Sequence, residues 1–155
     1  MDLKRKIVQR IEEMKRERYK TMFVVGNPLS GKTTIAKDVA NFLDAEYVDH
    51  LQDVLTKIKS PVIGAYSPID FRDYLKKKGN SSPKEVLIID EVQWLIATWS
   101  QKQRKELPRL LSFLETKSAV MLITTKPCEW INNVLSTSQG ELRILDIDQY
   151  GERYG

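Results

Sequence analysis

Residues 26–33 of the 155-residue chain read Gly26-Asn27-Pro28-Leu29-Ser30-Gly31-Lys32-Thr33, and they fit the pattern G-x-x-x-x-G-K-[ST] at every fixed position. Such a loop bends so that successive backbone N–H groups point at a phosphate chain, and its glycines leave room for close approach. We expect Lys32 to reach the β and γ phosphates and the Thr33 hydroxyl to ligate Mg²⁺, with Thr34 beside them. The stretch therefore predicts a site for a nucleoside triphosphate with magnesium.

The segments on either side of this loop have the pattern that a phosphate site requires. Residues 21–25 form an apolar run of strand length, and residues 32–43 place apolar side chains at 35, 36, 39, 42 and 43, which is one face of a helix. A helix that begins at the loop adds the positive end of its dipole to the site. This context argues against the alternative of a chance glycine turn.

Strand and helix patterns alternate along the rest of the chain. Further strands are predicted near residues 46–48, 85–89, 119–124 and 142–147. Helices are predicted over residues 2–19, 50–59, 67–78, 100–116 and 127–135, with Pro108 expected to kink or divide the fourth of these. Alternation of this kind predicts an α/β fold, a three-layer α/β/α sandwich around a five-stranded parallel sheet, as one domain over residues 1–155.

Charge and composition bear on partners and location. The net charge of +4 comes from residues 1–20, which hold eight basic and four acidic side chains. Two basic segments, residues 4–20 and residues 102–105 beside Trp94 and Trp99, are candidates for contact with DNA, although a solvated helix face and buried tryptophans are the simpler interpretations. A single cysteine, a charged N-terminus and the lack of a long apolar run predict a cytoplasmic protein without membrane contact.

A pair of carboxylates, Asp90-Glu91, directly follows the apolar run at residues 86–89. A carboxylate at the C-terminal edge of a central strand lies beside the nucleotide crevice of an α/β sheet. Asp90 is expected to hold magnesium through its water shell, and Glu91 to orient and deprotonate the attacking water. The alternative is that both residues only end a strand.

A second apolar run, residues 119–123, ends in Thr124 and Thr125. A hydroxyl at this strand end can touch the γ-phosphate or the attacking water, and Thr125 is the preferred candidate, with Thr124 next. A strand-end threonine without a catalytic role is the alternative.

Together these segments resemble the P-loop ATPases of the AAA+ group. The stretches GNPLSGKT, VLIIDE and LITTKP resemble the family's Walker A, Walker B and sensor-1 motifs, and residues 62–75 resemble its first pore loop and the helix after it. The resemblance implies ATP and Mg²⁺ as ligands, hydrolysis of ATP, assembly as a homo-oligomer, and an arginine supplied by a neighbouring subunit. Arg143 lies nearest the family's usual place for that arginine, with Arg104 and Arg109 as alternatives.

The chain also departs from that family's pattern. We expect no C-terminal helical lid and no sensor-2 arginine, and Val62 stands where a threading pore loop carries an aromatic residue.

In size and motif order the chain is similar to the BrxF family of small P-loop ATPases from type 3 BREX phage-defence systems, which implies a bacterial protein working with other defence proteins on DNA. Two other functions stay open: a nucleotide-dependent switch with little hydrolysis, and a small-molecule or nucleotide kinase. No Asn-Lys-x-Asp guanine motif is present, which favours ATP over GTP.

Overall fold

Five parallel strands form a single sheet in the order β2-β3-β4-β1-β5. The computed structural model describes residues 2–54, 56, 66–126, 128–131 and 143–150. The strands are β1 (Thr21–Gly26), β2 (Glu46–Asp49), β3 (Val86–Asp90), β4 (Ala119–Thr125) and β5 (Ile144–Asp146). The predicted α/β class and the five-stranded parallel sheet are confirmed.

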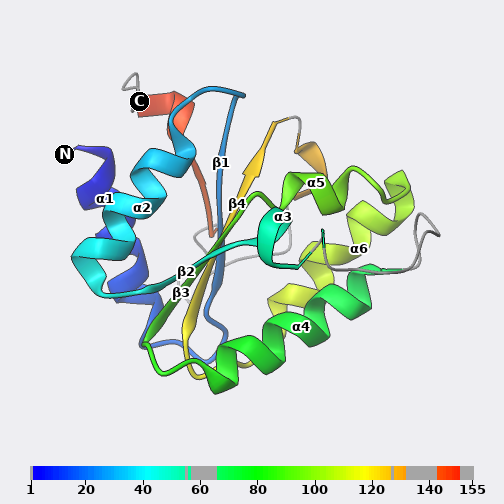
Figure 1. Cartoon of the computed structure of the whole chain (residues 1–155), viewed down its shortest axis with the longest axis horizontal. Helices are drawn as coiled ribbons and strands as arrows, with labels where there is room; N and C mark the ends of the chain where they lie inside the picture. Colours follow the sequence, from blue (N-terminus) through cyan, green and yellow to red (C-terminus); the bar gives the residue numbers. More distant parts are fainter. Residues whose placement is uncertain (1, 55, 57–65, 127, 132–142, 151–155) are drawn as a thin grey trace.

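Helices cover both faces of this sheet, as Figure 1 shows. The helices are α1 (Leu3–Met14), α2 (Lys32–Leu43), α3 (His50–Asp53), α4 (Pro68–Ser81), α5 (Gln93–Ile96) and α6 (Gln101–Ser112), with 3₁₀ turns η2 (Glu129–Ile131) and η3 (Ile147–Tyr150). One hydrophobic cluster joins α1 and α2 to the sheet, and a second joins α4, α5 and α6 to the opposite face. The predicted three layers are therefore present.

The apolar spacing of each segment explains which face it buries. In α1 the side chains of Leu3, Ile7, Ile11 and Met14 are buried, and they follow one another at three- or four-residue intervals. In β1, β3 and most of β4 every residue is buried, as expected for central strands covered on both sides. The two arrangements together make the sheet a rigid platform for the loops at its carboxyl edge.

Several element boundaries differ from those that the sequence predicts. Helix α1 ends at Met14 rather than at residue 19, and α6 ends at Ser112 rather than at 116. Pro108 lies inside α6 without dividing it. Of the predicted helices at 50–59 and 127–135 the structure shows only α3 and η2. Residues 55, 57–59, 127 and 132–135, and the segment from Val62 to residue 65, lie outside the described residues.

Strand register brings the predicted site residues to one edge of the sheet. Gly26, the last residue of β1, pairs with Thr125, the last residue of β4. Asp90, the last residue of β3, pairs with Asp49 at the end of β2. Since all strands are parallel, these carboxyl ends lie at the same edge of the sheet, and β4 lies between β1 and β3. The Gly26 loop and the Asp90-Glu91 pair thus face one another across the end of β4.

Candidate nucleotide-binding site

The phosphate loop connects β1 directly to α2, and glycine is required at both of its ends. Gly31 precedes α2 with φ 85°, in the left-handed region that side chains disfavour. At Gly26 a Cβ atom would lie 2.7 Å from both Ile147 Cγ1 and Ser30 Oγ, so the close approach of η3 depends on the missing side chain. The loop also holds Leu29 at φ 61° with 97% of its surface exposed. A strained backbone of this kind is typical of a ligand-binding loop.

Lys32 is a buried cation held by neutral oxygens. The residue is 8% exposed, and its ammonium donates to the carbonyl of Asn27 at 2.7 Å and to Ser30 Oγ at 3.4 Å. Among the described residues no carboxylate forms an ion pair with it. Burial lowers the pKa of Lys32, while Asp90, Asp148 and Glu91 oppose that effect from a distance. A buried cation at the N-terminus of α2, with no ion-pair partner in the described part of the chain, favours an anionic ligand.

Asp90 accepts three hydrogen bonds, two of them from α2 and β2. Its Oδ2 accepts from the hydroxyl of Thr33 at 2.7 Å and from the hydroxyl of Tyr47 at 2.6 Å, and its Oδ1 accepts from the backbone N–H of Glu91 at 2.8 Å. Burial and this contact with Asp90 raise the pKa of Tyr47. The three donors fix the carboxylate beside the Thr33 hydroxyl. Hard oxygen ligands such as these suit Mg²⁺, which keeps several of its waters.

Glu91 is held in one orientation by its own backbone and by α5. Its φ of 64° turns the chain sharply at the end of β3, and a non-glycine residue in this region is strained. Its Oε2 accepts from Gln93 Nε2 at 2.7 Å and from the indole Nε1 of Trp94 at 2.8 Å. Its Oε1 lies 3.4 Å from the Thr33 hydroxyl. One carboxylate oxygen is thus engaged by α5, while the other faces the metal-binding side of the site.

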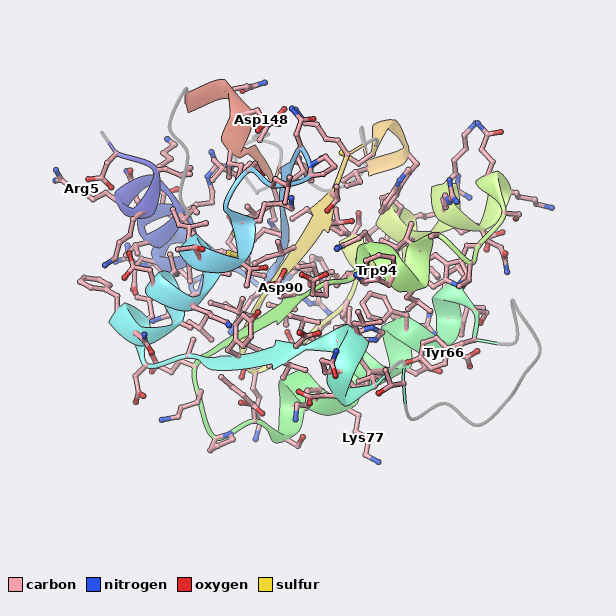
Figure 2. All side chains as sticks on the ribbon, turned by 45° about the horizontal axis from the view of Figure 1, so that its top comes forward. Arg5, Tyr66, Lys77, Asp90, Trp94 and Asp148 are labelled. Carbon is pink, nitrogen blue, oxygen red and sulfur yellow. The ribbon has the colours of Figure 1, made fainter. Side chains whose placement is uncertain are left out.

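A cavity of about 450 Å³ joins these parts. It is lined by Pro28, Leu29, Gly31, Lys32, Thr33, Thr34, Glu91, Gln93, Trp94 and Thr125. Figure 2 shows Asp90 at the end of its strand near the centre of the molecule and Trp94 on the side of α5. The structure therefore brings Thr125 to the same cavity as the loop and Glu91, whereas Thr124 is 1% exposed and lines none of it.

The turn after β5 fastens the start of the phosphate loop. Asp148 Oδ2 accepts from the backbone N–H of Asn27 at 2.9 Å and from Lys126 Nζ at 3.1 Å. Lys126 also pairs with Asp146 at 2.6 Å. Because Lys126 follows Thr125, this network joins the ends of β4 and β5 to the loop.

The structure does not support the role that the sequence suggested for Arg143. We expected it to act on the nucleotide of a neighbouring subunit, but it is 4% exposed and forms an ion pair with Glu17 inside the chain. A buried arginine engaged in this way cannot reach another molecule. Of the two alternatives, Arg104 donates to the carbonyls of Ile96 and Ala97, and Arg109 is exposed on α6.

Sequence reasoning missed the hydrogen-bond partners of the motif residues. Tyr47, Gln93 and Asp148 belong to no motif, and Trp94 was expected in the core, in a subunit contact or on a nucleic-acid surface. The position of Gln93 and Trp94, two and three residues after Glu91, is the single signal that could have suggested their contact with it. No comparable signal exists for Tyr47, which is 43 residues from Asp90 in the sequence.

The fold and the site together define a P-loop nucleotide-binding protein. Residues 22–144 match the family model described as "ATPase family associated with various cellular activities (AAA)", and the chain belongs to this family. Among solved structures, one similar chain comes from "Structure of Drosophila ORC bound to DNA", with a TM-score of 0.48 and 14% identity. The match covers 92% of this chain but 40% of that one, so this chain corresponds to less than half of it. A search of curated protein sequences gives no significant match.

Family membership implies that the site binds a nucleotide. The donor set fits ATP with magnesium, because a buried cation and a helix N-terminus face an anion while Thr33 and Asp90 offer oxygen ligands. No helix among the described residues has the length and apolar character needed to span a membrane.

Proposed function

We propose that the chain binds ATP with Mg²⁺ at the phosphate loop and hydrolyses it to ADP and phosphate. The observation that carries this proposal is the buried ammonium of Lys32, which lacks a carboxylate partner among the described residues and lies in the same cavity as Glu91. An anion on the loop would neutralise it. A carboxylate in that cavity can orient a water molecule for attack and accept its proton.

Each site residue has a part in the proposed reaction. The loop amides and Lys32 bind the phosphates, and Thr33 with Asp90 holds Mg²⁺, which supplies charge neutralisation when bound. Glu91 orients the attacking water and takes its proton through the oxygen that α5 leaves free. Thr125, the last residue of β4, pairs in register with Gly26 at the start of the loop and lines the same cavity.

Titration of Mg-ATP into the protein, followed by calorimetry, tests the binding step. We expect Lys32→Ala to weaken binding at least about tenfold, because a charged hydrogen bond to phosphate is lost. Lys37→Ala is the matched control, since Lys37 lies on α2 over the ring of Tyr47 rather than in the cavity. Equal affinity for Lys32→Ala and the wild type would remove the phosphate loop from the proposal.

A nucleotide-dependent switch with slow hydrolysis is the second candidate. No arginine lines the cavity within the part of the chain that the structure describes, and an arginine typically accelerates such hydrolysis by about 10³-fold or more. We therefore propose that full activity needs a second copy of the chain or another protein. Activity per subunit that rises with protein concentration favours assembly, and a flat, low rate at all concentrations favours the switch.

The biological setting is proposed from resemblance alone. The size and motif order shared with the BrxF ATPases suggest a bacterial, cytoplasmic role beside other phage-defence proteins on DNA. Loss of phage protection on Lys32→Ala, in a host that carries the complete system, tests this setting.

A further inference from the structure

We infer that a groove at the amino edge of the sheet, opposite the nucleotide site, binds single-stranded nucleic acid. The groove is about 970 Å³ and lies between α4, the end of α6 and the segments that lead into β1 and β4. Lys20 directly precedes β1 and Lys117 lies two residues before β4, whereas the phosphate loop follows the other end of β1. In Figure 1 these amino ends lie at the bottom of the sheet, beside α4.

The charges in this groove leave a positive excess. Its three carboxylates each already pair with an arginine: Glu17 with Arg143, Asp73 with Arg72, and Glu115 with Arg18. Its three lysines, Lys20, Lys76 and Lys117, form no ion pair with a described carboxylate. The excess charge comes from three different segments that converge on one concave surface. Such a surface attracts a polyanion.

An exposed aromatic ring lies among these charges. Phe113, which follows α6, is 69% exposed and is the most exposed aromatic residue of the described chain. Tyr19 supports it edge to face, with ring centroids 5.9 Å apart, and the guanidinium of Arg18 lies 5.3 Å from the Tyr19 ring. Burial of a phenylalanine is the usual outcome in folding, so a ring held out of the core in this way offers a surface on which a planar group can stack.

Phosphate-binding cations next to a stacking ring match an unpaired nucleic-acid strand better than the other polyanions. The bases of a duplex are already stacked on one another and are not free to contact Phe113. An acidic peptide would use the lysines but would have no planar group for the ring. The inference does not depend on ATP hydrolysis, because the groove shares no residue with the nucleotide cavity.

Fluorescence anisotropy of a labelled 12-nucleotide thymidine strand, titrated with the full chain at several salt concentrations, tests the inference. Lys76→Glu/Lys117→Glu removes two groove cations, and we expect at least about tenfold weaker binding and a shallower salt dependence. Phe113→Leu keeps an apolar side chain without the ring, and we expect about fivefold weaker binding or more.

Lys37→Glu/Lys77→Glu is the matched control. It makes the same charge change at two exposed lysines outside the groove, one on α2 and one on α4, and Figure 2 shows Lys77 pointing away from the molecule. We expect less than about twofold change for this control. Unaltered Mg-ATP binding by every variant shows that the fold is intact.

Three results would overturn the inference. The first is equal loss of binding in the groove variant and in the control, which would assign the effect to overall charge. The second is competition by duplex DNA or polyglutamate that is as effective as competition by the unlabelled single strand, so that each displaces the labelled strand at the same concentration. The third is unchanged affinity for Phe113→Leu, since an ionic surface without stacking would then explain all binding.

Discussion

At the scale of single residues, the proposed hydrolysis depends on how Glu91 is positioned. Gln93 and Trp94 both donate to Oε2, and the left-handed backbone of Glu91 fixes the direction of its side chain. A base held by neighbouring donors loses less entropy when it meets a water molecule. Trp94 is nevertheless 51% exposed, so the group that orients Glu91 is open to contact from outside.

Trp94→Phe tests this arrangement. Phenylalanine keeps the aromatic surface but lacks the N–H group, so we expect kcat to fall about tenfold with KM for ATP unchanged, as for the loss of one hydrogen bond to a charged group. The measurement is steady-state phosphate release. Trp99→Phe is the control, because the buried Trp99 donates to the carbonyl of Tyr66, outside the site, and its loss should lower stability and not kcat. An unchanged kcat for Trp94→Phe would make the contact incidental.

The ion pair between Arg143 and Glu17 supplies a second prediction at this scale. Removal of either partner leaves a largely buried charge unpaired, so we expect Arg143→Met to lower the free energy of unfolding by about 3 kcal/mol. Urea denaturation measures this loss, and the double variant with Glu17→Gln should lose less than the sum of the single variants. The opposite result would be an Arg143→Met variant that keeps the wild-type stability but loses ATPase activity, with the activity restored by mixing in Lys32→Ala chains. That result would show that Arg143 acts on the nucleotide of a neighbouring subunit.

The site residues that could be predicted from the sequence are those whose position follows from a local pattern. The phosphate loop, Asp90 and Glu91 each follow an apolar strand directly, so their position at the sheet edge follows from chain connectivity. Tyr47 and Asp148 reach the site only through packing of distant segments, over 43 and 121 residues respectively, and no local pattern encodes such contacts. Arg143 was misjudged because its sequence position does not reveal whether its side chain turns inward.

At the scale of elements, the start of α4 depends on a reciprocal cap. Ser67 Oγ accepts from the N–H of Asp70, and the Asp70 carboxylate accepts from the N–H of Ser67 at 2.8 Å. Proline at the first helical position adds a preset backbone angle. The same arrangement, with Ser100 and Gln103, opens α6. These caps explain why both helix starts were predicted within one residue.

Ser67→Ala tests how much the cap contributes. The helix would lose one satisfied N–H group, and we expect the free energy of unfolding to fall by about 1 kcal/mol, measured by urea denaturation. Ser81→Ala, at the last residue of the same helix, is the control and should change stability by less than about 0.5 kcal/mol. A larger effect at Ser81 than at Ser67 would contradict the role of the cap.

Helix ends were predicted less well than helix starts. The apolar spacing of α1 ends at Met14, and the charged residues 15–18 still favour a helix, but the chain there turns toward β1, and Tyr19 forms an isolated bridge with Glu115. Pro108 does not divide α6 because the helix tolerates one missing N–H, and the proline ring is buried against its neighbours. In both cases tertiary contacts outweigh local preference.

At the scale of the whole molecule, His50 links stability to pH. It is fully buried at the junction of β2 and α3, in edge contact with the rings of Phe71 and Tyr74, and neither ring nitrogen has a hydrogen-bond partner among the residues that the structure describes. Burial lowers the pKa of His50 from 6.5 to about 4, against a smaller opposing effect of Asp49. Because the folded state binds its proton less tightly than the unfolded state, the stability is fully present above pH 6.5 and is lost as the pH falls toward 4.

His50→Phe tests this linkage. Between pH 7.5 and pH 5.0 we expect the wild type to lose about 2 kcal/mol more unfolding free energy than the variant, since the variant has no group to protonate there. Urea denaturation at both pH values gives the difference, and comparison with the wild type cancels the contribution of the carboxylates. Parallel pH dependence of the two proteins would show that His50 is not the responsible group.

Phosphate release by the wild type and by Glu91→Gln, at saturating Mg-ATP, tests the central claim that this site hydrolyses ATP. We expect Glu91→Gln to lower the rate by about 10²-fold or more, because the amide cannot take a proton, while calorimetry shows Mg-ATP affinity within a fewfold of the wild type. Glu85→Gln, an exposed residue paired with Lys15 away from the site, should behave as the wild type. Retention of the wild-type rate by Glu91→Gln would contradict the account.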